Sequence, residues 1–470
     1  MSMVVQHNMQ AANANRMLGI TSGAQAKSTE KLSSGYKINR AADDAAGLTI
    51  SEKMRKQIRG LDKASSNAQD GVSSVQTAEG ALTEVHSMLQ RMNELAVQSA
   101  NGTNSSDDRQ AILDEVDQLT TEIDRVAETT KFNEIYLLKG DNSNTKNVYM
   151  KGHDAGLKGT LTDGAKSATF TMDALQAGDK YTIAGKEYTI GSATTEVTAL
   201  IDKANTDATA DTANKTVDVN GKTYTITYNA AGNTIADADG TAITLDDLKK
   251  AVTGGSKVTY GNTSLTAMTD ADTDGVDDDD SSIITKDVAE TKIKAELLTA
   301  NNIGTVDQAA TVEDANTANG KTSYTINKGY ATVADTLSFN LHVGADADMT
   351  NKITVDIDTM NSANLGIKGI NVKDASGTEA TYAIDAIADA VAKVSSQRSA
   401  LGAVQNRLEH TIDNLDNISE NTSSAESRIR DTDMAKEMVN YSKNNILAQA
   451  GQSMLAQANQ SNQGVLSLLQ

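Results

Sequence analysis

Long helical patterns occupy both ends of the chain, and their apolar positions repeat at spacings of four and three residues. Between about 45 and 100 the first run is Met54, Ile58, Leu61, Ala68, Val72 and Val75, with Ser65 in the gap. The second run continues in shifted phase as Ala78, Leu82, Val85, Leu89, Met92 and Ala96. Two consecutive spacings of three, from Val72 through Val75 to Ala78, are typical of a stammer that locally overwinds a coiled coil.

A second helix follows a break at residues 101–104, whose sequence Asn-Gly-Thr-Asn is typical of a turn. Ser106 or Asp107 is suited to cap this helix. Its apolar positions keep the spacing of four and three: Ile112, Val116, Leu119, Ile123 and Val126. The short connection predicts an antiparallel helical hairpin.

The C-terminal side of the chain mirrors this pattern. Its apolar positions are Ile387, Val391, Val394, Leu401, Val404, Leu408, Leu415, Ile418 and Ala425. Arg398 occupies one of the apolar slots of this repeat. Such stripes fit the core of a monomeric bundle, and they also fit helices that turn part of one face towards another subunit.

The two extreme ends, 1–40 and 431–470, carry much thinner stripes among many Asn, Gln, Ser and Ala residues. The C-terminal stripe consists of Met434, Met438, Tyr441 and Leu455. Segments that bury so little apolar area do not offset their ordering entropy alone. We therefore expect both ends to fold against partners.

The middle, about 146–335, has the alternation of β-strands. Val217–Ile226 alternates around Asn-Gly, which favours a type I′ hairpin. The phrase Gly-Lys-x-Tyr-Thr-Ile occurs at 185–190 and 221–226, and a looser copy runs from 320 to 326, as in a small repeat of hairpins. Short helices are expected near 196–205 and 245–252.

The fold class that follows is α+β: a long α-helical coiled-coil or bundle rod built from both chain ends, with a mainly β central insertion. Every arginine lies at or before Arg125 or at or after Arg398, so the middle differs from the ends in composition as well. Aromatics make up 3% of the chain and Pro is absent, which suits slim, uninterrupted helices with cores of Ala, Leu, Ile, Val and Met.

Charge and composition exclude several classes of protein. A formal net charge of −21 argues against a nucleic-acid binder. Residues 1–23 have no apolar core of a signal peptide, and no later run approaches about 20 apolar residues, so no membrane span is expected. Cys is absent, which excludes disulfides and thiolate chemistry. The five His are scattered without metal-ligand spacing, and no nucleophile or nucleotide-binding motif is present, so we expect no enzyme activity.

One acidic stretch resembles the first half of a calcium-binding loop. Asp270, Asp272 and Asp274 alternate before Gly275, and Asp278 falls at the ninth position. Ser281 occupies the twelfth position, where a bidentate Glu is wanted, and no flanking helices of an EF-hand are expected. Two interpretations stay open: a calcium loop, or a solvated acidic loop.

Four phrases on each side of the chain together are similar to those of one known family. On the N-terminal side the similar stretches are LSSGYKIN at 32–39, AADDAAG at 41–47, QRMNELAVQSAN at 90–101 and EIDRV at 122–126. On the C-terminal side they are LGAVQNRL at 401–408, SRIRDTDMA at 427–435, QA at 449–450 and SNQGVLSLL at 461–469. With these phrases both ends closely resemble bacterial flagellin, the filament subunit of the flagellum. The resemblance covers roughly the first 140 and the last 130 residues, in order.

The resemblance implies three domains. Residues 1–40 and 431–470 would form the terminal helical domain in the filament core, and 41–145 with 336–430 a helical rod domain. Leu341–Asp346 is similar to the β-hairpin phrase of that rod domain. Residues 146–335 would form the variable, solvent-facing, β-rich outer region.

The resemblance also implies partners and a location. The chain would polymerise with itself into the extracellular filament that serves swimming, and contact the filament cap and the hook–filament junction proteins. It would leave the cell through the flagellar type III export apparatus, with a dedicated export chaperone on its C-terminal segment.

Arg91, Leu95 and Glu115 match the family's contacts with the flagellin-sensing Toll-like receptor of animals. The same residues also fit a face that packs against a neighbouring subunit in the filament.

Two other interpretations are compatible with parts of the sequence. A hook–filament junction protein shares weaker similarity at the ends, and the close match through Gln470 favours the filament subunit instead. The middle is also suited to be an adhesin or a calcium-binding module displayed on the filament.

Overall fold

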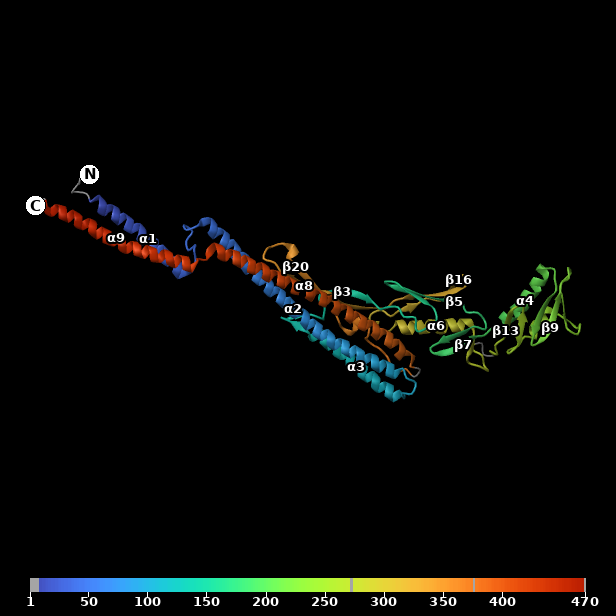
Figure 1. Cartoon of the computed structure of the whole chain (residues 1–470). Coiled ribbons are helices and arrows are strands. Elements are labelled where there is room, and N and C mark those ends of the chain that lie inside the picture. The colour runs from blue at the N-terminus through green and yellow to red at the C-terminus, as the bar shows by residue number, and fades with distance from the viewer. Residues whose placement is uncertain (1–7, 271–273, 375–376, 469–470) are drawn as a thin grey trace. The chain divides into compact units, whose positions relative to one another are not determined.

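The computed structural model describes residues 8–270, 274–374 and 377–468. Long helices come from both ends of the chain and strands fill the middle (Figure 1), which confirms the α+β fold class. The chain forms two compact units, one of residues 1–75, 339–355 and 403–470, the other of residues 76–338 and 356–402. Each unit is described by itself below.

The helices have the following bounds. They are α1 Met9–Ser34, α2 Ala45–Ser99, α3 Ser106–Thr129, α4 Thr194–Ala210, α5 Leu245–Lys250, α6 Lys286–Asn301, α7 Ser362–Leu365, α8 Thr378–Arg430 and α9 Met434–Leu468, with a 3₁₀ turn η1 Met349–Asn351.

The strands are short by comparison. They are β1 Lys131–Phe132, β2 Ile135–Tyr136, β3 Asp141–Tyr149, β4 Thr160–Asp163, β5 Ser167–Asp173, β6 Lys180–Ile183, β7 Lys186–Ile190, β8 Lys215–Val219, β9 Lys222–Thr227, β10 Thr234–Asp237, β11 Ala242–Ile243, β12 Lys257–Tyr260, β13 Thr263–Thr266, β14 Ile283–Ile284, β15 Thr311–Val312, β16 Asn316–Ala318, β17 Lys321–Asn327, β18 Tyr330–Asp335, β19 Leu337–His342 and β20 Lys352–Ile357.

In the first unit, α1 and α9 pack along each other, so the two ends of the chain meet. The side-chain oxygen of Asn8 caps α1 by accepting from the Ala11 amide, and its side-chain nitrogen donates to the Ala458 carbonyl at 3.1 Å. Beyond α1, the first half of α2 pairs with the last part of α8. The predicted gap residue Ser65 lies in this contact, where its hydroxyl donates to Asp416 at 3.0 Å.

A two-stranded hairpin, β19 with β20, covers α2 and α8 in the same unit. The apolar cluster between hairpin and helices has four buried members, Ala68, Val343, Ile353 and Leu408, and four partly buried ones, Val72, Leu341, Val404 and Ile412. A Cβ at Gly71 would overlap Leu341, so α2 keeps a glycine where the hairpin lies closest. The stretch Leu341–Asp346 thus belongs to a β-hairpin, as its sequence predicts.

The helical part of the second unit has the core that the second apolar run predicts. All six of its members are buried: Ala78, Leu82, Val85, Leu89, Met92 and Ala96. Helix α3 follows the tight turn after α2, but its cap is Ser105, not Ser106 or Asp107. Ser105 and Asp108 form a capping box, whose reciprocal hydrogen bonds satisfy two amides and explain why the helix starts one residue earlier.

Three sheets of three or more strands lie in the described part of the insertion. Strands β15, β17, β5 and β4 lie in that order with β16 beside β17, the order β14-β7-β6 forms a second sheet, and β11-β10-β9-β8-β12-β13 a third. Helix α4 shares a core with the third sheet, and α6 with the first two. The predicted helices near 196–205 and 245–252 correspond to α4 and α5.

The repeated phrase marks the same local structure each time, namely the turn and second strand of a hairpin. The turn residues Ala184-Gly185, Asn220-Gly221 and Asn319-Gly320 all have positive φ, as type I′ turns require. The repeat predicted from the sequence is therefore a repeat of hairpin turns.

The insertion leaves and rejoins the helices by a pair of antiparallel strands, β3 and β18. Their register runs from Tyr149 opposite Tyr330 to Asp141 opposite Asp335. The predicted domain boundaries at 145 and 335 fall on these two strands. Those at 40 and 430 fall in the connections that join α1 to α2 and α8 to α9.

The close approach of two glycines gives a sharp test of packing in the second unit. Gly304 follows α6 with φ of 75°, and a Cβ there would lie 2.7 Å from Gly366 Cα and against the Gly366 carbonyl. Gly320 has nearly the same φ, 73°, but a Cβ there meets no atom within 4 Å. Gly304→Ala therefore adds a backbone clash to the strain that both share.

We expect Gly320→Ala to cost about 1 kcal/mol and Gly304→Ala at least about 3 kcal/mol. Calorimetric melting of the full chain measures both, and a similar melting temperature for the two variants would contradict the close packing at Gly304.

Candidate assembly interface

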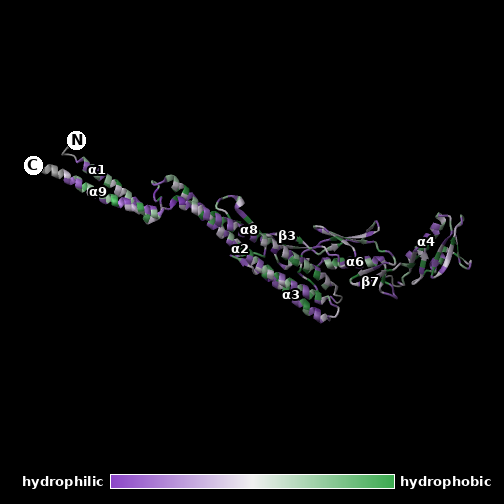
Figure 2. Ribbon diagram, in the orientation of Figure 1, coloured by the Kyte–Doolittle hydropathy of each residue, from purple (hydrophilic) through white to green (hydrophobic). Residues whose placement is uncertain are grey.

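Large apolar side chains stay exposed along the paired terminal helices. On α9 they are Met434, Met438, Val439, Ile446, Leu447 and Met454, and on α1 they are Met9, Met17 and Ile20. Figure 2 shows hydrophobic positions interspersed among polar ones along both helices. The pairing of α1 with α9 thus uses only part of the apolar surface that these helices carry.

Part of this surface is gathered into a shallow groove on α9. Met438, Val439, Ile446 and Leu447 line it, together with Ser442 and Lys443. Ile446 is 67% exposed and Met438 55% exposed. Each such side chain is worth about 1.5–3 kcal/mol when it is removed from water, so the groove is a strong candidate for contact with another chain.

The residues predicted to form a receptor or assembly face do not all reach the surface. Arg91 on α2 joins Glu115 on α3 at 2.9 Å and Glu94 at 3.1 Å. The hydrogen bond to Glu115, then that to Glu94, raises the pKa of Arg91. Leu95 is only 2% exposed. Arg91 and Glu115 therefore form an accessible charged pair, and Leu95 contributes packing beneath the surface.

The turn between α2 and α3 is held by a residue that the sequence pattern did not single out. Arg109 is buried, and its guanidinium donates to the carbonyls of Ser99 and Asn101 at 3.1 and 3.3 Å. The Ser99 hydroxyl in turn donates to the Val372 carbonyl at 2.6 Å. A buried arginine aimed at the last carbonyls of a helix compensates for bonds that the helix end leaves unmade.

The acidic loop uses its described carboxylates to hold its own backbone. Asp270 accepts from the amides of Asp274 and Gly275 at 3.1 and 3.0 Å, and Asp274 accepts from the Val276 amide at 2.8 Å. The Asp278 amide donates to the Thr269 carbonyl. Asp272 lies outside the described residues.

Sequence reasoning missed Asp277, which anchors this loop. Its carboxylate accepts from the amides of Thr269, Asp279 and Asp280 at 2.9–3.0 Å. Among the residues that the structure describes, no group of three or more His, Cys, Asp or Glu side chains is arranged to hold a metal ion. The calcium loop at Asp270, Asp272, Asp274 and Asp278 stays a prediction.

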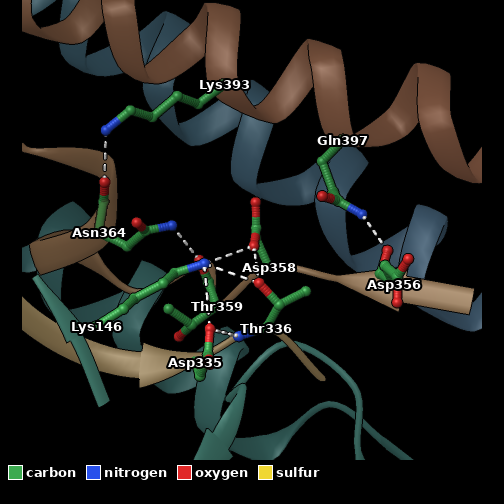
Figure 3. A network of polar contacts seen from close by, with 9 residues as sticks. All are labelled: Lys146, Asp335, Thr336, Asp356, Asp358, Thr359, Asn364, Lys393 and Gln397. Atoms are coloured by element: carbon green, nitrogen blue, oxygen red, sulfur yellow. Dashed lines mark hydrogen bonds and ion pairs between the residues drawn. The ribbon is translucent and has the colours of Figure 1, made fainter. Parts of the chain in front are cut away.

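A polar network joins the base of the insertion to the end of β20 in the second unit (Figure 3). Lys146 on β3 donates to Asp358 and to the Thr336 hydroxyl, both at 2.8 Å, and Thr336 donates to Asp358 at 2.6 Å. Asp335 lies 3.9 Å from the Lys146 ammonium. Burial raises the pKa of Asp358, but the bonds from Lys146 and Thr336 outweigh it and hold the pKa below its usual value.

Helix α8 joins the same region through two long side chains. Lys393 donates to the Asn364 carbonyl at 2.7 Å, and Gln397 donates to the Asp356 carbonyl at 3.0 Å (Figure 3). Burial lowers the pKa of Lys393, while the charges of Asp389 and Asp358 oppose that shift. Backbone carbonyls near the ends of β20 and α7 thus accept hydrogen bonds from side chains of α8.

In the part of the chain that the structure describes, no helix combines the length and apolar character that a membrane crossing needs.

Comparisons with known proteins agree along the whole chain. Residues 5–143 match the bacterial flagellin N-terminal helical region, and residues 384–469 match the bacterial flagellin C-terminal helical region. Flagellin of Clostridium tyrobutyricum is 40% identical over 467 residues, covering 98% of this chain and 100% of that protein. Flagellin B of Vibrio anguillarum is 35% identical over 477 residues, covering all of both chains.

A solved flagellar junction protein from Legionella pneumophila is far less similar. It is 13% identical, the superposition covers 81% of this chain and 99% of that one, and the TM-score is 0.31.

The network around Lys146 makes a pH-dependent prediction. A carboxylate whose pKa is depressed on folding stabilises the protein above its unfolded pKa, about 3.9 for Asp, and this contribution is lost as the pH falls through the folded value. Lys146→Met leaves Asp358 partly buried without its cation, so we expect a lower melting temperature than that of the wild type at pH 7.

The difference between the two melting temperatures should narrow as the pH falls below about 4, because Asp358 becomes protonated first in the unfolded chains and in the variant and then, through its lowered pKa, in the folded wild type. Thermal unfolding at pH 7 and pH 3.5 measures it, with the exposed Lys158→Met as control. An equal gap at both pH values would show that the carboxylate charge is not the cause.

Proposed function

This chain belongs to the bacterial flagellin family, and we propose that it is a structural subunit of the flagellar filament. We propose that this filament is built outside the cell and drives swimming motility. We further propose that the chain is exported by the flagellar type III apparatus with a chaperone on its C-terminal segment, and that it meets the filament cap and hook–filament junction proteins at the two ends of the polymer. Family membership disfavours the alternative that the chain is itself a junction protein.

The exposed apolar side chains on α1 and α9 are the observation that supports self-assembly most directly. They lie on the two helices that the chain's opposite ends provide, and pairing leaves residues such as Ile446 and Met438 open to water. When neighbouring subunits cover these side chains, apolar surface leaves water and the free energy falls. Assembly and ordering of the ends are therefore coupled. Contacts of this head-to-tail kind that do not close produce a helical filament.

Electron microscopy of the purified subunit, alone and with sheared filament seeds, tests assembly. We expect long filaments from the full chain and none from a chain lacking 1–40 and 431–470. Ile446→Asp should raise the concentration needed for seeded growth by at least about tenfold, because a carboxylate is desolvated in the groove.

Gln452→Glu is the matched control for that variant, since it adds the same charge at an exposed position of the same helix that does not line the groove and does not neighbour Ile446. Wild-type monomers that do not polymerise on filament seeds would contradict the assembly proposal. Filaments of Ile446→Asp at wild-type concentration would remove the groove from the interface. Swimming of cells that carry wild-type or Ile446→Asp chains then tests motility.

We also propose that the monomer is bound by the flagellin-sensing Toll-like receptor of animals at a face that includes Arg91 and Glu115. Both side chains are about half exposed and joined in an ion pair, and Glu94 also bonds Arg91, so the guanidinium is held in place for a third acidic or carbonyl partner. Leu95 would act on this face from beneath, through packing. In the filament the same face would be used by a neighbouring subunit.

Binding of the purified receptor ectodomain to the monomer measures this. Arg91→Ala should weaken binding at least about tenfold with an unchanged melting temperature. Leu95→Ala should lower the stability of the helices by about 2–5 kcal/mol, because it opens a cavity. Arg125→Ala, which removes another exposed ion-paired arginine, is the control, and undiminished binding by Arg91→Ala would exclude this face.

A further inference from the structure

Two connecting segments lie side by side, one between α1 and α2 and the other between α8 and α9. Residues 35–37 leave α1, and residues 430–432 lead into α9. They pair as a short antiparallel bridge between Tyr36 and Asp431. The Lys37 amide donates to the Arg430 carbonyl at 2.7 Å, and the Thr432 amide donates to the Gly35 carbonyl at 2.9 Å. We call the segments 35–37 and 430–432 the joint.

Arg430 fills the joint with its side chain. The guanidinium lies over the Tyr36 ring at 4.8 Å and reaches Glu52 on α2 at 2.8 Å and Glu426 on its own helix at 3.9 Å. Only 16% of the side chain is exposed. The bond from Arg430 lowers the pKa of Glu52. One side chain thus contacts the exit of α1, the start of α2 and the end of α8.

The same region is tied to α1 from the other side. Lys27 on α1 lies 3.2 Å from Asp43, and Glu30 accepts from Arg40 at 2.9 Å. Asp43 also accepts from the amides of Asn39 and Arg40, which fixes the connection before α2. The last turns of α1 therefore contact the chain that follows them, and α9 begins four residues after Arg430.

We propose that the joint is a latch through which the pair α1–α9 and the pair formed by α2 and α8 become ordered together, with Arg430 as its positioning residue. This inference rests on the proposed self-assembly. Packing in the filament stabilises the terminal helices, and the joint couples that stabilisation to the ordering of α2 and α8. Without the joint, the two connecting segments would remain unpaired when the terminal helices become ordered. The entropic cost of restricting these segments would then offset part of the stabilisation. Arginine suits the position because its flat guanidinium stacks on an aromatic ring while it bonds a carboxylate, which lysine does not do as well.

Three full-length variants test the latch: Arg430→Gln, Arg430→Lys and Arg428→Gln. Arg428 is an exposed arginine two residues away on the same helix, so its variant controls for lost charge. Arg430→Gln should raise the concentration needed for seeded growth about tenfold, and Arg430→Lys should recover only part of it. Arg428→Gln should grow like the wild type.

Amide hydrogen exchange of the soluble monomers gives a readout that does not depend on polymerisation. The amides around Glu52 on α2 and Glu426 on α8, which Arg430 contacts, should exchange faster in Arg430→Gln, while the amides at 58–75 of α2 keep their protection. Faster exchange throughout α2 would mean general unfolding and would overturn a role confined to the joint. Unchanged exchange and unchanged growth of Arg430→Gln would overturn the latch and leave self-assembly standing. Failure of the wild type to grow on seeds would instead contradict self-assembly, and the exchange data would then decide on the latch alone.

Discussion

Burial of small aliphatic side chains between helices from opposite ends of the sequence is the constraint on which the fold depends. Residues such as Leu61 and Leu415, or Ala68 and Leu408, find their partners only after more than three hundred residues of intervening chain. Closing so long a loop is entropically costly, although the cost grows only slowly with its length. Long helices with continuous stripes meet that cost because each heptad adds another buried pair. The absence of proline keeps those stripes unbroken over the whole of α2 and α8.

Much of this could be predicted from the sequence, and the reason is periodicity. The second apolar run of α2 is buried at every position, and the polar gap residue Ser65 faces a polar partner across the helix pair. The Asn220-Gly221 hairpin turn could be predicted in the same way, since the preference of Asn-Gly for such turns has a local cause. Local turn chemistry and regular burial both leave a pattern in neighbouring residues, so the sequence alone is enough to predict them.

Other features depend on contacts that the sequence does not announce. Helix α6 was not predicted, because it lies in a strand-rich stretch. In hindsight its signals were the cap at Thr285 and the buried spacing of Ala289, Ile293 and Leu297. Leu95 was assigned by its position in a motif, and only three-dimensional packing separates it from its exposed neighbour Arg91. The joint was also unseen, because Tyr36 and Arg430 are far apart in sequence and neither belongs to an apolar stripe.

The strand pair β3–β18 has a bearing on how such a chain can diversify. Because the two strands lie side by side in fixed register, the polypeptide returns to the place that it left, whatever lies between. Residues added or removed between Tyr149 and Tyr330 then alter neither the separation of β3 and β18 nor the place from which the chain continues towards α8. The helical scaffold and its cargo can accumulate changes at independent rates, and selection on one need not constrain the length, charge or composition of the other.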